Sequence, residues 1–151
     1  MPSTNPQPST TDSSVAAAHK TLFDQGIKIR YEVAGQSYVD AALAGGASDF
    51  SRPMQELVTE ACWGSVWSRP GLERKQRSLN NVAMLCALNR GPELAAHVRG
   101  AVNNGATEVE IRETILQAAI YCGMPAGIEG TKIAEKVLVG MREEKGREGK
   151  K

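Results

Sequence analysis

The sequence predicts an all-α fold of six to seven helices joined by short loops. Apolar residues recur with the spacing of one helix face, and no segment shows the alternation typical of a half-buried strand. Glycine and proline residues divide the chain into segments of helical length. The 151 residues, of which 41% are hydrophobic and 23% charged, suit a single folded domain.

The N-terminal half contains an arm and three expected helices. Residues 1–15 are rich in proline, serine and threonine, so we expect them to form a disordered arm. Residues 16–35 and 37–46 each end at glycine and are expected to form the first two helices. Residues 49–67 carry an apolar stripe typical of a third helix, which ends before a Pro-Gly pair.

The C-terminal half begins with two expected helices. The first ends before a Gly-Pro pair, and the second starts at that pair. Residues 72–90 place Val82 and Cys86 on one apolar face. Residues 91–105 have proline in the first turn, where its missing N–H costs nothing, and end at a glycine.

Two further helices complete the predicted domain. Thr107 and Glu110 have the spacing of a capping box, which predicts the start of a helix that runs to residue 121. The last helix is expected over residues 126–143, and residues 144–151 are expected to form a charged flexible tail. The folded domain then spans residues 16–143. Its many alanines and glycines leave a small core, which favours a homo-oligomer.

The composition argues against several classes of function. A net charge of +1 provides no general attraction to nucleic acid or membrane, and 5% aromatic residues leave few surfaces on which bases could stack. Three separated cysteines without a C-x-x-C pair argue against a disulfide framework, a zinc knuckle and a dithiol redox centre. No apolar run reaches the roughly 18 residues of a membrane span, and no signal peptide is visible. We therefore expect a cytoplasmic protein without nucleic-acid or membrane partners.

Metal and cofactor motifs are also absent from the sequence. The two histidines, His19 and His97, are far apart, and no H-E-x-x-H motif occurs. Neither of the glycine-rich phosphate-binding motifs, G-x-x-x-x-G-K-[ST] and G-x-G-x-x-G, is present. We expect no metal and no cofactor.

Glu93 and His97 are the first candidate catalytic residues. Their spacing of four residues places both side chains on one helix face, and Glu93 lies in the first turn, where the helix dipole favours an anion. A carboxylate can orient an imidazole and raise its pKa, which produces a general acid or base near neutral pH. The alternative is an ordinary surface pair that contributes a few tenths of a kcal/mol to stability.

Other chemistry-bearing residues have structural alternatives as well. Cys122 lies at the C-terminal end of an apolar helix, where the dipole does not lower a thiol pKa, so a core position is the simpler interpretation. Trp63 and Trp67, four residues apart, could line a pocket or fill the core. The basic cluster of Arg69, Arg74, Lys75 and Arg77 could bind a substrate carboxylate or form a solvated face.

The string over residues 61–126 closely resembles the carboxymuconolactone decarboxylase family. Three motifs carry the resemblance in fixed order: W-G-x-x-W-x-R-P-G-L from Trp63, E-L-x-x-H from Glu93, and Q-x-A-I-Y-C-G-x-P from Gln117. The likeness extends more weakly to the segment FDQGIKIRYEVAGQSYVD, which includes Arg30.

This resemblance implies an all-α fold shared with the alkylhydroperoxidase-D-like proteins and a homo-oligomer, either a trimer or a hexamer. Redox members of that group carry a C-x-x-C with a histidine four residues after its second cysteine. Here Glu93 stands four residues before His97, which disfavours dithiol chemistry. The namesake reaction removes CO2 from a small cyclic carboxylate, 4-carboxymuconolactone, without a cofactor, because the unsaturated lactone accepts the electron pair.

The resemblance assigns roles to individual residues. Glu93 would orient His97, and His97 would donate the proton to carbon. An arginine, either Arg30 or one from the Arg69–Arg77 stretch, would hold the remaining acid group. The expected substrate-binding residues are Arg30, Trp63, Trp67, Arg77, Cys122 and Ile128.

Three positions depart from the bacterial decarboxylases of this family. Ala61 and Lys132 stand where those enzymes have histidine, and Ile128 stands where they have asparagine. The pocket is therefore expected to be more apolar, and its substrate could differ from the namesake lactone. Two alternatives stay open: an isomerase, cyclase or tailoring enzyme acting on another cyclic acid, and a non-catalytic helical oligomer.

Overall fold

The computed structural model describes residues 13–149 of the chain. Within this range the protein consists of seven α-helices and one π-helix and contains no strand, so the predicted all-α class is confirmed. The elements are α1 (Ser13–Ala34), α2 (Gln36–Gly45), α3 (Arg52–Leu57), η1 (Val58–Val66), α4 (Arg74–Ala87), α5 (Gly91–Asn103), α6 (Glu108–Cys122) and α7 (Met124–Glu148).

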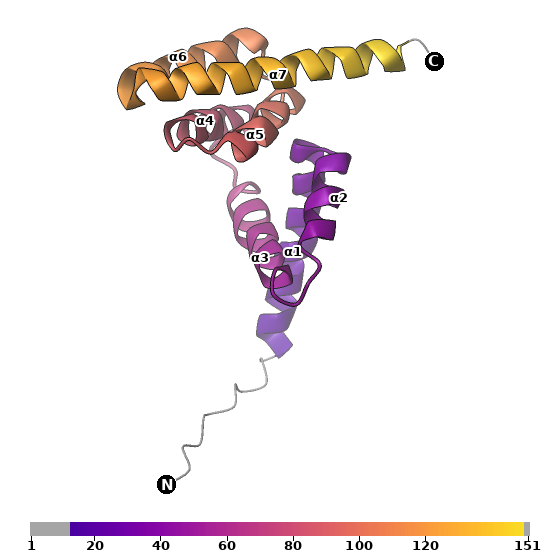
Figure 1. The fold of residues 1–151 in the computed structure, drawn as a ribbon. Coiled ribbons are helices and arrows are strands. Elements are labelled where there is room, and N and C mark those ends of the chain that lie inside the picture. Colours follow the sequence, from indigo (N-terminus) through magenta and orange to yellow (C-terminus); the bar gives the residue numbers. More distant parts are fainter. Residues whose placement is uncertain (1–12, 150–151) are drawn as a thin grey trace.

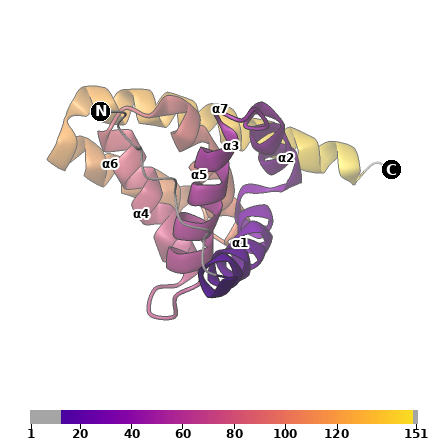
Figure 2. The ribbon, with the colours of Figure 1, turned by 90° about the horizontal axis from the view of Figure 1, so that it is seen from below.

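The helices are arranged as a stacked bundle with a protruding limb. Helices α4 and α5 form one layer, and α6 and α7 lie across it as a second layer, while α1, α2 and α3 form the limb below (Figure 1). The limb is held together mainly by α1 packing along η1. It joins the bundle where α1 contacts α5, and the turned view also places these two helices side by side (Figure 2).

Each of these two parts has its own apolar core. Buried residues of α4, α5, α6 and α7 form the larger cluster, centred on Val82, Leu94, Val98 and Ile111. The limb has a smaller cluster of Ile29, Val33, Trp63 and Trp67. No helix within residues 13–149 is long and apolar enough to cross a membrane.

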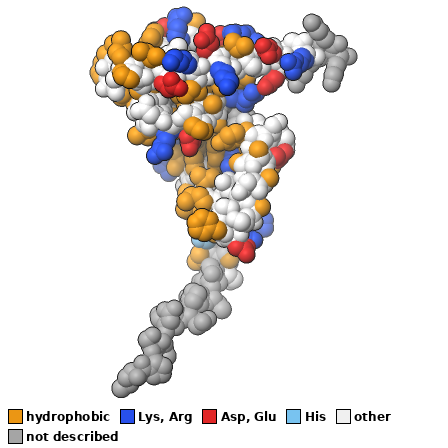
Figure 3. Space-filling model, viewed as in Figure 1, with side chains coloured by type: hydrophobic (Ala, Val, Ile, Leu, Met, Phe, Trp, Pro, Cys, Tyr) orange, Lys and Arg blue, Asp and Glu red, His pale blue; other side chains and the backbone are white. Residues whose placement is uncertain are grey.

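Large apolar side chains are also exposed where α6 meets α7. Figure 3 shows hydrophobic side chains gathered at this end of the upper layer and along the limb. The exposed residues at the α6–α7 end are Leu116, Ile120, Tyr121, Met124 and Ile128. An apolar patch of this kind is typical of an interaction surface.

Several predicted boundaries differ from the observed ones. Helix α1 already includes residues 13–15, which were expected in the N-terminal arm, and the rest of that arm lies outside the described residues. Helix α7 continues through most of the expected tail to Glu148, because its charged residues favour a solvated helix as readily as a coil. The expected single helix over 49–67 is divided into α3 and the π-helix η1.

The π-helix η1 packs very closely against α1, and two glycines permit this approach. A Cβ on Gly26 would lie 2.1 Å from the Thr59 carbonyl oxygen, and one on Gly64 would lie 2.2 Å from the Leu22 carbonyl oxygen. Only glycine permits backbones to pack at these distances. The wider turn of η1 places Thr59 and Trp63 against α1, and π-helical turns of this type are frequent at functional sites.

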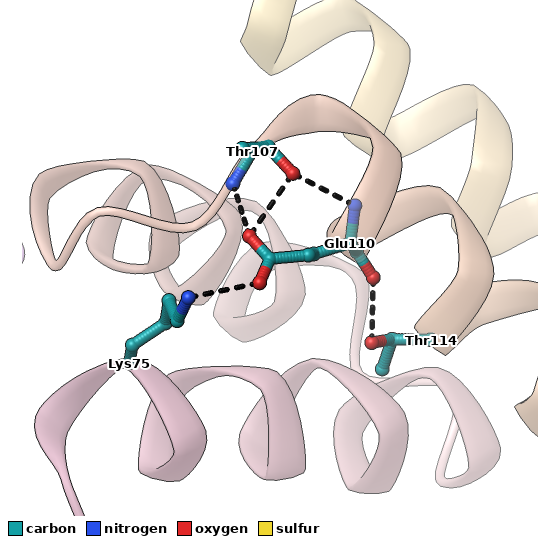
Figure 4. Close-up of polar contacts among 4 residues, drawn as sticks. All are labelled: Lys75, Thr107, Glu110 and Thr114. Atoms are coloured by element: carbon teal, nitrogen blue, oxygen red, sulfur yellow. Dashed lines mark hydrogen bonds and ion pairs between the residues drawn. The ribbon is translucent and has the colours of Figure 1, made fainter.

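The predicted capping box at the start of α6 is confirmed and extends to α4. The Thr107 hydroxyl accepts a hydrogen bond from the Glu110 backbone N–H at 3.1 Å, and the Glu110 carboxylate accepts one from the Thr107 N–H at 2.8 Å. Lys75 of α4 forms an ion pair with the same carboxylate at 2.9 Å (Figure 4). These hydrogen bonds and the ammonium lower the pKa of Glu110 to about 2.

We expect the Glu110→Gln variant to have a lower free energy of unfolding than the wild type at pH 7. The native carboxyl titrates near pH 2 and an unfolded one near 4.5, so its stabilisation is fully present above pH 4.5 and disappears as the pH falls toward 2. Urea unfolding at pH 7, 5 and 3 measures this convergence. Glu113→Gln removes a charge from the same helix without touching the cap and is the control. A constant difference between wild type and Glu110→Gln at all three pH values would contradict this assignment.

Candidate active site

A cavity lies at the junction of the limb and the bundle. Its volume is ≈ 150 Å³, and helices α1, α2 and α5 and the π-helix η1 contribute its walls. Three of the predicted site residues line it, namely Arg30, Trp63 and His97. The other lining residues are Val33, Ala34, Tyr38, Val58, Cys62, Ala96 and Gly100.

His97 lies on the wall formed by α5, between the two tryptophans and α4. Its ring stacks on Trp63 with a centroid distance of 6.3 Å and on Trp67 at 6.4 Å. The Asn81 amide nitrogen lies 3.3 Å from Nδ1 of His97 and donates to it. Because an amide nitrogen only donates, this contact fits the neutral imidazole that carries its proton on Nε2.

Burial lowers the pKa of His97 below its ordinary value of 6.5, and the negative charge of Glu93 partly offsets this effect. Glu93 itself is exposed in the first turn of α5. The hydrogen-bond partner of His97 in the described structure is Asn81 rather than Glu93. The negative charge of Glu93 therefore affects the pKa of His97, whereas Asn81 of α4 orients the His97 ring.

Arg30 of α1 also lines the cavity. Its side chain is buried, with 5% of the residue exposed. One terminal nitrogen, Nη1, donates to the Thr59 hydroxyl at 3.0 Å, and the other, Nη2, donates to the Gln55 side-chain oxygen at 2.9 Å. Nε is buried and has no hydrogen-bond partner among the described residues.

Among residues 13–149, no acidic side chain forms an ion pair with Arg30. Each of the ion pairs formed within residues 13–149 joins other side chains. Burial lowers the pKa of Arg30, although an arginine stays protonated across the physiological range. A buried cation without a counter-ion is costly unless an anion completes it. The arrangement is therefore suited to receive a carboxylate.

The remaining predicted site residues do not line this cavity. Trp67 is buried and packs on Trp63 with a ring-centroid distance of 4.9 Å. Arg77 donates to the Leu72 and Arg69 carbonyl oxygens and thereby holds the loop before α4.

Cys122 and Ile128 lie outside the cavity. Cys122 is exposed and lines a different groove, between α4 and α6. Ile128 is exposed on α7, and Ala61 and Lys132 are also exposed. The three positions that depart from the bacterial pattern therefore do not line this cavity within the single chain.

Sequence reasoning did not identify Gln55, Thr59 and Asn81. Gln55 and Thr59 are four residues apart and share one helix face, which is a local signal of a common target. Nothing in the sequence indicates that this target is Arg30, which lies 25 and 29 residues away. Asn81 likewise meets His97 only through the packing of α4 on α5.

Comparison with known proteins identifies the family of the chain. The family model of the carboxymuconolactone decarboxylase family matches residues 52–136, which is more than half of the chain. The chain belongs to this family. The matched region includes Gln55, Thr59, Asn81 and His97, whereas Arg30 lies before it.

Two proteins that are similar to this chain are named decarboxylases. The chain is 49% identical over 128 residues to the nitrosuccinic acid decarboxylase npaB of Metarhizium robertsii, covering 85% of this chain and 89% of the relative. It is 41% identical over 116 residues to the 4-carboxymuconolactone decarboxylase of Acinetobacter baylyi, covering 77% and 86%. An uncharacterized 15.0 kDa protein of Paracoccus denitrificans is 33% identical over 102 residues, covering 62% and 76%.

Proposed function

We propose that this protein is a carboxy-lyase that removes CO2 from a small acid with a second anionic group. One observation carries the proposal: the buried guanidinium of Arg30, without an acidic partner, shares a cavity with His97. Arg30 would hold the carboxylate that is retained. The carboxylate that leaves would lie toward the apolar wall formed by Trp63, where loss of charge as CO2 is favourable.

The substrates named for the two decarboxylase relatives share the chemistry that such a site needs. In 4-carboxymuconolactone, the electron pair of the broken C–CO2 bond can pass through the C=C bond to the lactone carbonyl. In nitrosuccinic acid, the same pair can pass to the nitro group. Each molecule is its own electron sink and keeps an anionic group after CO2 has left. The proposed substrate class is therefore a small acid with a built-in electron sink, and either of these acids is a candidate.

His97 would return a proton to the carbon that lost CO2. In the free protein the imidazole is mostly neutral at pH 7, because burial lowers its pKa. A bound dianion adds negative charge to the cavity and raises the pKa of His97, so the proton donor is formed when the substrate is present. Protonation also turns Nδ1 into a donor, and Asn81 would then present its amide oxygen by rotating its side chain. Solvent restores the proton after product release.

Direct measurement of CO2 tests this proposal. The wild-type protein is incubated separately with nitrosuccinic acid and with 4-carboxymuconolactone, and CO2 release is compared with the enzyme-free rate while NMR identifies the product. Enzyme-dependent CO2 release from either acid supports the proposal. A new product formed without CO2 release would identify an isomerase, cyclase or tailoring enzyme. No reaction with either acid would contradict the proposed substrate class.

The site supports a specific role for Glu93, which we expect to appear in a titration of His97. Glu93→Gln should lower the pKa of His97 further, because it removes a negative charge that favours the imidazolium. The chain has only two histidines, so NMR can follow the His97 ring signals individually. Glu135→Gln removes a charge from α7 and serves as control. An unchanged His97 titration in Glu93→Gln would rule out an electrostatic role for Glu93.

We also propose that the chain assembles as a homo-oligomer, either a trimer or a hexamer. The exposed apolar side chains at the α6–α7 end support this assembly, because a compact monomer rarely leaves such a cluster in water. Cys122 and Ile128 lie at this end, so they would contact a neighbouring subunit rather than the cavity of their own chain.

A further inference from the structure

The two side chains that hold the guanidinium of Arg30 are both uncharged. The Gln55 side-chain oxygen accepts from Nη2 at 2.9 Å, and the Thr59 hydroxyl accepts from Nη1 at 3.0 Å. The Thr59 hydroxyl itself donates to the Gln55 backbone carbonyl at 2.7 Å, so its lone pairs face Arg30. These two contacts fix the plane of the guanidinium without neutralising its charge.

The position of Gln55 is further restricted by Gly46 at the end of α2. A Cβ on Gly46 would lie 2.3 Å from Cγ of Gln55, so the side chain packs tightly against this backbone. Thr59 is fully buried, with no exposed surface. Both acceptors are therefore held in place before any ligand arrives, which lowers the entropy cost of binding.

The hydrogen bonds to Gln55 and Thr59 use two of the five N–H donors of Arg30. Nε–H is one of the donors that stay without a partner. A carboxylate can bind the side of a guanidinium through Nε–H and the adjacent N–H of Nη2, which forms two parallel charge-assisted hydrogen bonds. Nε–H of Arg30 therefore keeps a hydrogen-bonding capacity that Gln55, Thr59 and the other described residues do not use.

We propose that Gln55 and Thr59 are positioning residues that select substrates retaining a carboxylate, because they orient Arg30 while leaving its charge uncompensated. The inference rests on the proposed function in taking the bound anion to be the substrate carboxylate that is not lost. An acidic residue in place of Gln55 would pair with Arg30 inside the free protein. It would then compete with the substrate for the same cation.

Gln55→Glu tests this competition with a single-charge change. The probe is succinate, a small dicarboxylate without an electron sink, and binding is measured by isothermal titration calorimetry. We expect Gln55→Glu to bind succinate at least about tenfold more weakly than the wild type, while its melting temperature without ligand is unchanged or higher. Gln76→Glu makes the same substitution on the exposed first turn of α4 and should bind as the wild type does.

Equal succinate affinities of Gln55→Glu and the wild type would overturn the inference, as would the absence of succinate binding by the wild type. Gln55→Met keeps the side-chain length but adds no charge, and it provides a second comparison if Gln55→Glu does not fold. We expect Gln55→Met to weaken succinate binding severalfold. Wild-type affinity in Gln55→Met would contradict the positioning role.

Substitutions at Thr59 separate positioning from simple structural support. Thr59→Val removes the hydroxyl at nearly constant volume, and Thr59→Ser restores it. We expect Thr59→Val to weaken succinate binding severalfold and Thr59→Ser to recover it. Both substitutions alter the packing of a buried side chain, so a difference between them reports on the hydroxyl. With a substrate that releases CO2, Thr59→Val should raise KM more than it lowers kcat, and Thr59→Ser should return KM toward the wild-type value. A loss that Thr59→Ser does not recover would indicate a structural role alone.

The outcomes also separate this inference from the proposed function. Succinate binding that depends on Gln55, without CO2 release from either candidate acid, would support the inference and refute the proposed substrate class. CO2 release from a candidate acid, with succinate affinity unaffected by Gln55→Glu, would support the proposed function and refute the inference.

Discussion

Replacement of His97 by glutamine is expected to reduce kcat for CO2 release by about 10²–10⁴-fold, the usual contribution of a positioned acid or base. Glutamine has a similar length and can still hydrogen-bond to Asn81, but it cannot transfer a proton near neutral pH. KM should change little, because the substitution leaves the proposed contacts of Arg30 with the retained carboxylate unaltered. Steady-state kinetics with the acid that releases CO2 measures both constants.

His19→Gln is the matched control for this substitution, because His19 is the other histidine of the chain and lies outside the cavity. Its kcat should equal that of the wild type. If His97→Gln retained wild-type kcat, the proton would have to come from another group and His97 would have a structural role. Circular dichroism spectra of the variants confirm that each is folded before the rates are compared.

Replacement of Arg30 by methionine is expected to lower kcat/KM by roughly 10²-fold or more. The reason is the loss of charge-assisted hydrogen bonds to the retained carboxylate, each of which contributes about 1.5–3 kcal/mol. Methionine fills a similar volume, and removal of a buried charge without a counter-ion offsets part of the cost of leaving Thr59 and Gln55 without a donor. We therefore expect the variant to fold.

Arg77→Met distinguishes a specific site from a general loss of positive charge. Arg77 donates hydrogen bonds to backbone carbonyls of the loop before α4. Its replacement should therefore lower the stability of that loop and leave KM nearly unchanged. A KM increase in Arg77→Met that equals the increase in Arg30→Met would contradict the assignment of the carboxylate to Arg30. Full activity of a folded Arg30→Met variant would contradict it directly.

Much of the fold could be predicted from local sequence patterns. Three signals act within a few residues of the helix ends that they mark. They are the capping box of Thr107 and Glu110, the Gly-Pro pair at the start of α5, and Gly105 after the end of α5. The π-helix was not predicted; it contains Gly64, whose close approach to a carbonyl of α1 is a tertiary contact that the local sequence pattern does not show. The segment 49–67, whose apolar pattern predicts one α-helix, therefore contains both an α-helix and a π-helix.

The candidate site was predictable in part. The spacing of Glu93 and His97 placed both on α5, and the electrostatic effect of one on the other follows from that spacing. The partner of the His97 ring was not predictable, because Asn81 reaches it from α4. Sequence reasoning also left several arginines as candidates for the carboxylate site, and only Arg30 lines the cavity next to His97.

The sequence by itself determined the all-α class, the main helix boundaries and the family, because period, caps and motifs are properties of short segments. The tertiary structure alone decided that Gln55 of α3 and Thr59 of η1 hold Arg30 of α1, and that Arg30 shares a cavity with His97 of α5. Their meeting depends on how closely helices pack, which Gly26 and Gly64 permit at one crossing. This packing buries the charge of Arg30 and places no acidic partner beside it among residues 13–149, which is the basis of the proposed carboxylate site.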